Sequence, residues 1–128
     1  MQANTMKYSR QREAVRSFLM SRKDHPTAEI VYNNLKEQFP HISLGTVYRN
    51  LSLLVELGEA VKFPGIDGFE HFDGNVSPHY HFICKNCCAV IDLPMPTLEY
   101  INEEAGKGFD GTISDHSAFF YGKCAKCK

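Results

Sequence analysis

The sequence predicts an α+β fold, in which an N-terminal winged helix-turn-helix lobe is followed by a small α/β lobe. In the first half, three stretches show apolar residues at helical spacing, and a strand–turn–strand pattern follows them. The second half carries two Cys-x-x-Cys pairs that lie far apart in the chain. The charge is also unevenly divided: residues 1–63 contain nine Lys or Arg and six Asp or Glu, whereas residues 64–128 contain five and nine.

The first two helices are predicted from apolar faces and from the residues that bound them. Residues 9–21 place four apolar side chains on one face and arginines on the others, which is an amphipathic pattern. His25 and Pro26 then break the chain, and Thr27 can cap a second helix. The apolar stripe of this helix extends over residues 28–39, and Pro40 ends it.

A third helix and a wing complete the first lobe. Ser43 can cap the helix, and Gly58 can end it in the left-handed conformation. Residues 60–63 and 69–72 flank a turn rich in Pro and Gly, which predicts a two-stranded wing. In such a fold the third helix reads DNA. The candidate DNA contacts are Thr46, Tyr48, Arg49 and Asn50 of this helix, with Arg10 and Arg12 of the first. In a second interpretation, Tyr48 only seals the flank of its helix.

The second lobe is predicted to be strand-rich. Residues 79–84 read as a strand whose alternation places His79 and His81 on one face and Cys84 on the other, so the two histidines can chelate one ion. Another strand is expected over residues 89–93, a short helix over 97–104, and strand-rich structure over 109–121. The strand edges could pair two copies of this lobe.

The cysteines predict a structural zinc site. Cys84, Cys87, Cys124 and Cys127 can converge on one tetrahedral Cys₄ site, which is closed to other ligands. In a reducing compartment, two Cys-x-x-Cys pairs favour a metal over disulfides. A thioredoxin-like redox pair is the alternative, although that motif usually accompanies a βαβ pattern, and none is visible here. Cys88 is left over as a spare thiol.

The chain is therefore divided into a DNA-binding domain at residues 1–73, a linker at residues 74–78 and a metal-binding domain at residues 79–128. A basic first half joined to an acidic second half is typical of a DNA-binding lobe fused to a regulatory lobe. No apolar run approaches ~20 residues and no hydrophobic signal region begins the chain, so we expect a cytoplasmic protein without a membrane partner.

Five motifs occur in order along the chain. They are Ser9-Arg10-Gln11-Arg12, His25-Pro26-Thr27-Ala28-Glu29, Thr46-Val47-Tyr48-Arg49-Asn50-Leu51, Phe72-Asp73-Gly74-Asn75, and His79-Tyr80-His81 leading into Cys84 and Cys87. Together they resemble the ferric uptake regulator family of metal-dependent repressors over essentially the whole length. The resemblance implies a homodimer that binds double-stranded operator DNA, each subunit having a winged helix and a dimerisation lobe. No enzymatic activity is implied.

The resemblance also implies two kinds of metal site. Structural zinc maps onto the four cysteines of the two Cys-x-x-Cys pairs. A regulatory ion that bridges the lobes maps onto His25, Asp73, His79, His81 and Asp92. Three imidazoles and two carboxylates suit Fe(II), Mn(II) or Zn(II) rather than a thiolate-loving ion. An ion held from both sides of a hinge would shift the population toward the closed, DNA-binding state.

Two features of this ligand set resemble the peroxide-sensing branch of the family: the residue at position 92, and Asp73 six positions before His79. Asp occupies position 92, as in the peroxide-sensing members of the family, whereas related iron sensors tend to carry Glu there. In those members, peroxide reacts at bound Fe(II) and oxidises a ligand histidine, for which His25 and His79 are the candidates here. Peroxide is the one small molecule expected to react. An iron- or zinc-uptake regulator that uses the same site without oxidation is the alternative.

Two interpretations from other classes are a thiol oxidoreductase built on the Cys-x-x-Cys pairs and a zinc-ribbon adaptor that binds only protein. The adaptor interpretation gives no role to the wing or to His25. Among the remaining histidines, His71 is expected on the wing surface, His41 in a loop, and His116 as a surface or core residue rather than a ligand of an additional metal.

Overall fold

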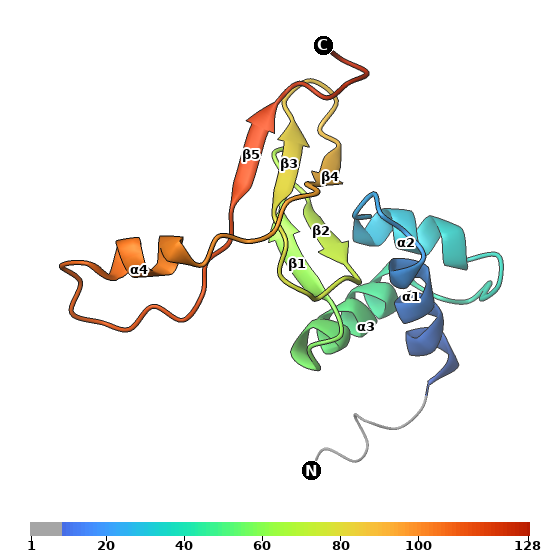
Figure 1. Cartoon of the computed structure of the whole chain (residues 1–128). Helices are drawn as coiled ribbons and strands as arrows, with labels where there is room; N and C mark the ends of the chain where they lie inside the picture. The colour runs from blue at the N-terminus through green and yellow to red at the C-terminus, as the bar shows by residue number, and fades with distance from the viewer. Residues whose placement is uncertain (1–8) are drawn as a thin grey trace. The chain divides into compact units, whose positions relative to one another are not determined.

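The computed structural model describes residues 9–128, and their contacts divide the chain between Val76 and Ser77 into two compact units. The division falls inside the predicted linker. Figure 1 shows the three helices and the hairpin β1–β2 that precede it, and the strands β3, β4 and β5 with helix α4 that follow it. Within residues 9–128, no helix has the length and apolar character needed to cross a membrane.

Each of the first three helices begins at a hydroxyl cap, and two of these caps, Thr27 and Ser43, are predicted from the sequence. Helix α1 spans Arg10–Met20, α2 spans Ala28–Leu35 and α3 spans Leu44–Glu56. The hydroxyl groups of Ser9, Thr27 and Ser43 accept backbone N–H bonds from the first turns of these helices. Since the first N–H groups of a helix lack partners within it, each cap contributes about 1 kcal/mol.

The ends of α2 and α3 differ in how well the sequence predicts them. Gly58 follows α3 with φ of 77°, and the N–H of Glu59 donates to the carbonyl of Leu54 over 2.9 Å, which confirms the expected glycine stop. Helix α2 ends at Leu35 rather than at Phe39, so its predicted length was wrong. Pro40 disfavours helical backbone at Phe39, and the chain closes in turns that still pack Phe39 against the core.

The predicted wing is an antiparallel hairpin of β1, Val61–Pro64, and β2, Glu70–Asp73. Val61 pairs with Asp73, and Phe63 pairs with His71. The connecting turn is closed by the Gly65 N–H, which donates to the Phe69 carbonyl over 2.9 Å. This register places the end of β2 beside the start of β1.

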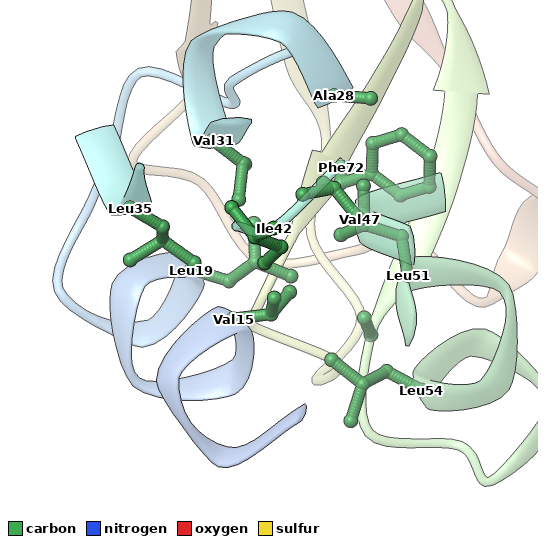
Figure 2. Packing of buried hydrophobic residues seen from close by; sticks show 11 residues of the cluster. Val15, Leu19, Ala28, Val31, Leu35, Ile42, Val47, Leu51, Leu54 and Phe72 are labelled. Atoms are coloured by element: carbon green, nitrogen blue, oxygen red, sulfur yellow. The ribbon is translucent and has the colours of Figure 1, made fainter. Parts of the chain in front are cut away.

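The core of the first unit is built from all three helices and β2. Figure 2 shows side chains of α1, α2 and α3 gathered in one cluster with Ile42 and with Phe72 of β2. The buried apolar residues are Val15, Leu19, Ala28, Val31, Leu35, Ile42, Val47, Leu51, Leu54, Ala60 and Phe72. Those that lie in the helices follow the spacing from which the three helices are predicted, whereas Ile42, Ala60 and Phe72 lie outside them.

Replacing Leu51 with Ala is expected to lower the free energy of unfolding of the first unit by about 2–5 kcal/mol, because Leu51 is fully buried and a cavity would remain. Urea denaturation followed by circular dichroism measures the change. Leu53→Ala on the same helix is the control, since Leu53 is only half-buried and its truncation should cost much less. Equal losses in the two variants would contradict this core assignment.

The second unit contains a three-stranded sheet in the order β4–β3–β5. The central strand β3, His81–Cys84, is antiparallel to β4, Val90–Asp92, and parallel to β5, Phe119–Gly122. Its small buried set includes Tyr80, Ile83, Cys84, Val90 and Cys124. This unit buries few large apolar side chains compared with the first one.

Three predicted boundaries in this unit were wrong. The strand begins at His81 rather than at residue 79, three positions after Pro78, which cannot donate to a sheet. Helix α4 spans Tyr100–Gly106 rather than 97–104, and no side chain caps it. Within residues 109–121, only the stretch from Phe119 is strand, because the preceding segment has no neighbouring strand to pair with in the described chain.

Candidate metal centres

The four cysteines of the two Cys-x-x-Cys pairs form one Cys₄ cluster at one end of the sheet in the second unit. Cys84 ends β3, Cys124 follows β5, and all four sulfurs lie within 4.8 Å of one another. The Sγ atoms of Cys87 and Cys124 are 3.8 Å apart. Tetrahedral zinc with Zn–S bonds of ~2.3 Å places neighbouring sulfurs ~3.8 Å apart, so the cluster fits a structural zinc ion.

Hydrogen bonds prepare one of these sulfurs for the thiolate form. The backbone N–H groups of Cys87 and Cys124 donate to Cys84 Sγ, each over 3.4 Å, and lower the pKa of this thiol to about 6. The Asn86 N–H makes a third such bond. These bonds therefore favour the thiolate form of Cys84, which is the form that binds zinc.

The pKa values of two neighbouring thiols, those of Cys87 and Cys127, are shifted upward instead. The pKa of Cys87 is raised to about 11: a hydrogen bond from the Ala89 backbone acts to lower it, but its contacts with Cys84 and the other sulfurs, together with burial, outweigh that effect. The pKa of Cys127 is also raised: the hydrogen bond from the Asn86 side chain acts to lower it, but its contact with Cys124, burial and its contact with Cys84 together outweigh that effect. A divalent cation would favour all four thiolates, as a zinc site requires.

Cys88 lies directly after this cluster but outside its set of four ligands. It has φ of 66°, a left-handed conformation that a non-glycine residue rarely adopts, and its N–H donates to the Cys84 carbonyl over 2.9 Å. Its backbone thus closes the knuckle turn.

The second unit also brings together two histidines and a carboxylate. His79 Nε2 lies 3.2 Å from Asp92 Oδ1, and His81 Nε2 lies 3.5 Å from the same oxygen. The centroids of the two imidazole rings are 4.4 Å apart, and Asp92 is paired with His81 across the β3–β4 ladder. Stacking on Phe119 orients the His81 ring. The expected grouping of His79, His81 and Asp92 is present, and its nitrogen and oxygen donors suit Fe(II), Mn(II) or Zn(II).

The first unit contains a separate histidine–carboxylate pair. His25 Nε2 lies 3.1 Å from Asp73 Oδ2, and both side chains are buried. The other oxygen of Asp73 accepts the Asn75 N–H over 2.9 Å, which orients the carboxylate. Buried charged groups are usually paired or bound to metal, so this pair is a second candidate set of ligands.

His71 lies in a different place from the one predicted. It was expected on the wing surface, but it is buried, with Nδ1 2.7 Å from the His25 carbonyl and Nε2 2.8 Å from Asp67 Oδ2. Burial acts to raise the pKa of Asp67, but the Phe69 N–H and the His71 ring together hold it below its usual value. The sequence could have hinted at this position, because His71 and Asp73 alternate onto one face of a strand.

The predicted DNA-contacting residues lie on α1 and α3. Tyr48 and Arg49 are exposed, whereas Thr46 and Asn50 are half-buried. Arg49 donates to the Thr46 hydroxyl over 3.0 Å. On α1, Arg10 is exposed and its guanidinium lies over the ring of Phe39, while Arg12 is half-buried at the capped first turn.

His116 is part of a hydrogen-bond chain in the second unit. Its Nε2 faces the hydroxyl of buried Tyr80, and its Nδ1 lies 2.7 Å from Asn102 Oδ1. The Tyr80 hydroxyl also accepts the Leu98 N–H over 2.9 Å. This arrangement accounts for His116 as a half-buried structural residue that links the sheet to α4.

Comparison with known proteins gives one consistent result. A model of the ferric uptake regulator family matches residues 3–121. The peroxide-responsive repressor PerR of Staphylococcus epidermidis is 35% identical over 118 residues, which cover 92% of this chain and 79% of that protein. The protein of the same name from Staphylococcus aureus is also 35% identical over 118 residues, covering 92% and 80%.

Solved structures agree with this match. The peroxide stress regulator of Campylobacter jejuni has a TM-score of 0.78 at 31% identity, with 91% of this chain and 88% of that chain covered. The ferric uptake regulator of Helicobacter pylori has a TM-score of 0.83 at 24% identity, covering 98% and 85%, a likeness that concerns the fold. Together these structures confirm the predicted α+β fold with a winged helix.

Proposed function

The chain belongs to the ferric uptake regulator family, and we propose that it is a metal-dependent transcriptional repressor that senses peroxide. Membership supports the general statement that it is a metal-responsive regulator of transcription rather than an enzyme. Peroxide sensing is the finer proposal. It is supported by the identity to proteins described as peroxide-responsive repressors and by Asp92 beside His79 and His81.

We propose that His25 and Asp73 from the first unit and His79, His81 and Asp92 from the second bind one regulatory ion. The donor chemistry supports this, because three imidazoles and two carboxylates match the preferences of Fe(II) and Mn(II). An ion that needs ligands from both units would favour the arrangement in which the winged helices are placed for an operator, as population shift requires. The closeness of each histidine to a carboxylate within its own unit is the observation that carries the proposal.

Peroxide would act on this site through its histidines. Fe(II) held by these residues would supply the electron-transfer chemistry by which peroxide oxidises a ligand imidazole, one peroxide oxygen entering the ring and the other leaving as water. His25 and His79 are the proposed targets, and each would gain one oxygen atom. Because an oxidised imidazole is a poorer ligand, the hold between the two units would weaken and repression would end.

Operator DNA is the proposed partner, bound by a homodimer. Exposed Tyr48 and Arg49 of α3, with Thr46 and Asn50 beside them, form the proposed reading surface. Arg10 and Arg12 at the start of α1 are proposed to contact phosphates. A salt-dependent affinity for duplex DNA would exclude a purely protein-binding adaptor.

Mass spectrometry of the iron-loaded protein after exposure to peroxide tests the proposal. We expect a gain of ~16 Da on peptides that contain His25 or His79, together with loss of operator binding, since one oxygen atom is inserted per event. Manganese-loaded protein is the control, and it should keep both its mass and its DNA binding. Metal-dependent DNA binding that is indifferent to peroxide would instead favour an uptake regulator, and a redox cycle at zinc-free cysteines would favour an oxidoreductase.

A further inference from the structure

We propose that His71 is a positioning residue for His25: it holds the backbone of His25 in the conformation that directs the imidazole toward Asp73. This inference rests on the proposed function, because it concerns a ligand of the proposed regulatory ion. It assigns a role to a histidine that is not itself among the five proposed ligands. All residues involved lie in the first unit, so the argument uses contacts within a single compact body.

The backbone of His25 needs support from outside its own loop. His25 has φ of 57°, in the left-handed region, and its side chain is 1% exposed. A non-glycine residue in this region is strained and persists only where the surrounding structure determines it. Proline follows directly, which further restricts the backbone at this position.

Three successive residues of β2 provide that support. The ring of His71 lies with Nδ1 2.7 Å from the His25 carbonyl, and the Phe72 N–H donates to the Pro26 carbonyl over 3.0 Å. The next residue, Asp73, faces the His25 imidazole at 3.1 Å. β2 therefore holds both the main chain and the side chain of the loop between α1 and α2. Of the two contacts to the main chain of the loop, the one to the His25 carbonyl is made by a side chain, that of His71, and therefore depends on the identity of that residue.

His71 is itself fixed on its other sides. Its Nε2 lies 2.8 Å from Asp67 Oδ2 in the wing turn, and its ring stacks on Phe63 with centroids 6.0 Å apart and an interplanar angle of 11°. Phe63 also contacts the ring of His25 edge-on, with centroids 5.8 Å apart. At Gly65, an added Cβ would lie 2.7 Å from the His71 ring. These contacts with the wing turn and with Phe63 fix the position of the His71 ring, so that its Nδ1 faces the His25 carbonyl.

The two ring nitrogens of His71 face different parts of the unit, since Nδ1 faces the His25 carbonyl and Nε2 faces the Asp67 carboxylate. A carbonyl can only accept, so Nδ1 carries the hydrogen in the tautomer that holds the His25 loop. The two roles can be separated by substitution. The amide nitrogen of Asn is as many bonds from Cα as Nδ1 of His, whereas that of Gln corresponds to Nε2. His71→Asn therefore keeps a donor for His25, and His71→Gln keeps a donor for Asp67.

The test measures Mn(II) binding to the zinc-loaded, full-length protein by isothermal titration calorimetry. We expect His71→Gln and His71→Phe to weaken Mn(II) binding by about 10–100-fold, the usual effect of losing a residue that orients a metal ligand. His71→Asn should remain within about threefold of the wild type. Equal affinities for the wild type and all three variants would overturn the inference, as would an Asn variant as weak as the Gln variant.

A second readout needs no regulatory metal. In ¹H–¹⁵N spectra of the zinc-loaded protein without Mn(II), the ring signals of His25 should shift or broaden in His71→Gln and His71→Phe but not in His71→Asn. Zinc content and melting temperature establish that each variant is folded. If His71→Phe does not fold, the comparison of His71→Asn with His71→Gln is sufficient to test the inference. A wild type that binds no Mn(II) would refute the proposed function, while unchanged His25 signals in the Gln variant would refute the positioning role.

Discussion

Replacing Cys84 with Ser is expected to unfold residues 77–128 while the helices of the first unit remain. A structural zinc site contributes roughly 10–16 kcal/mol in apparent binding free energy, more than a whole small domain usually retains as net stability. The second unit depends on this contribution because its apolar core is small, with Tyr80, Ile83 and Val90 as its main buried side chains besides the cysteines. Cys84 is also the sulfur that accepts three backbone N–H bonds.

The measurement is a ¹H–¹⁵N spectrum together with the zinc content of the purified protein. Signals from the second unit should collapse to the narrow range of an unfolded chain, and removal of zinc from the wild type by a chelator should have the same effect. Cys88→Ser is the matched control, since Cys88 lies outside the four-sulfur cluster and should retain one zinc per chain. A folded second unit in zinc-free protein would show that the cluster is not its main source of stability.

Replacing His81 with Ala should have the second large effect, a loss of more than about 100-fold in affinity for the regulatory metal. Loss of a residue that only orients a ligand already lowers metal affinity about 10–100-fold, so loss of a proposed ligand should lower it further. His81 is buried against Phe119 and shares Asp92 Oδ1 with His79, so its removal leaves that carboxylate with a single imidazole neighbour in the pair.

Mn(II) titration and metal-dependent binding to operator DNA measure this effect. The zinc content should be unchanged, because Cys84 begins the separate Cys₄ cluster at the other end of β3. His41→Ala is the control, since His41 is exposed and lies outside the metal-binding groups found in the described chain. An affinity close to that of the wild type in His81→Ala would exclude this histidine as a ligand.

Much of the fold could be predicted because its signals are local. The hydroxyl caps at Thr27 and Ser43 and the glycine after α3 act within a few residues, and the structure contains each of them. Less could be predicted in the second unit, where β5 pairs with a strand far away in sequence. Strand boundaries there depend on the partner rather than on the segment itself, which explains the error over residues 109–118.

The candidate metal-binding groups were also predicted in part from local sequence patterns and in part not. Cysteine spacing predicts the Cys₄ cluster, and alternation along one strand predicts that His79 and His81 share a face with Cys84 turned away. Proximity of Asp92 to these histidines came from family resemblance, and the β3–β4 register supplies its physical reason. The binding of one ion by both units remains a proposal.

The sequence alone determined the elements, their order and the residue types that can bind metal, because caps, periodicity and ligand spacing are properties of short segments. Only the tertiary structure decided the place of His71, which appears in the sequence as an ordinary wing residue. Its partner in the first loop is 46 positions away, and burial between that loop and the wing turn gives the contact its effect. Such a contact depends on how the hairpin folds back onto the helices, which local sequence patterns do not specify.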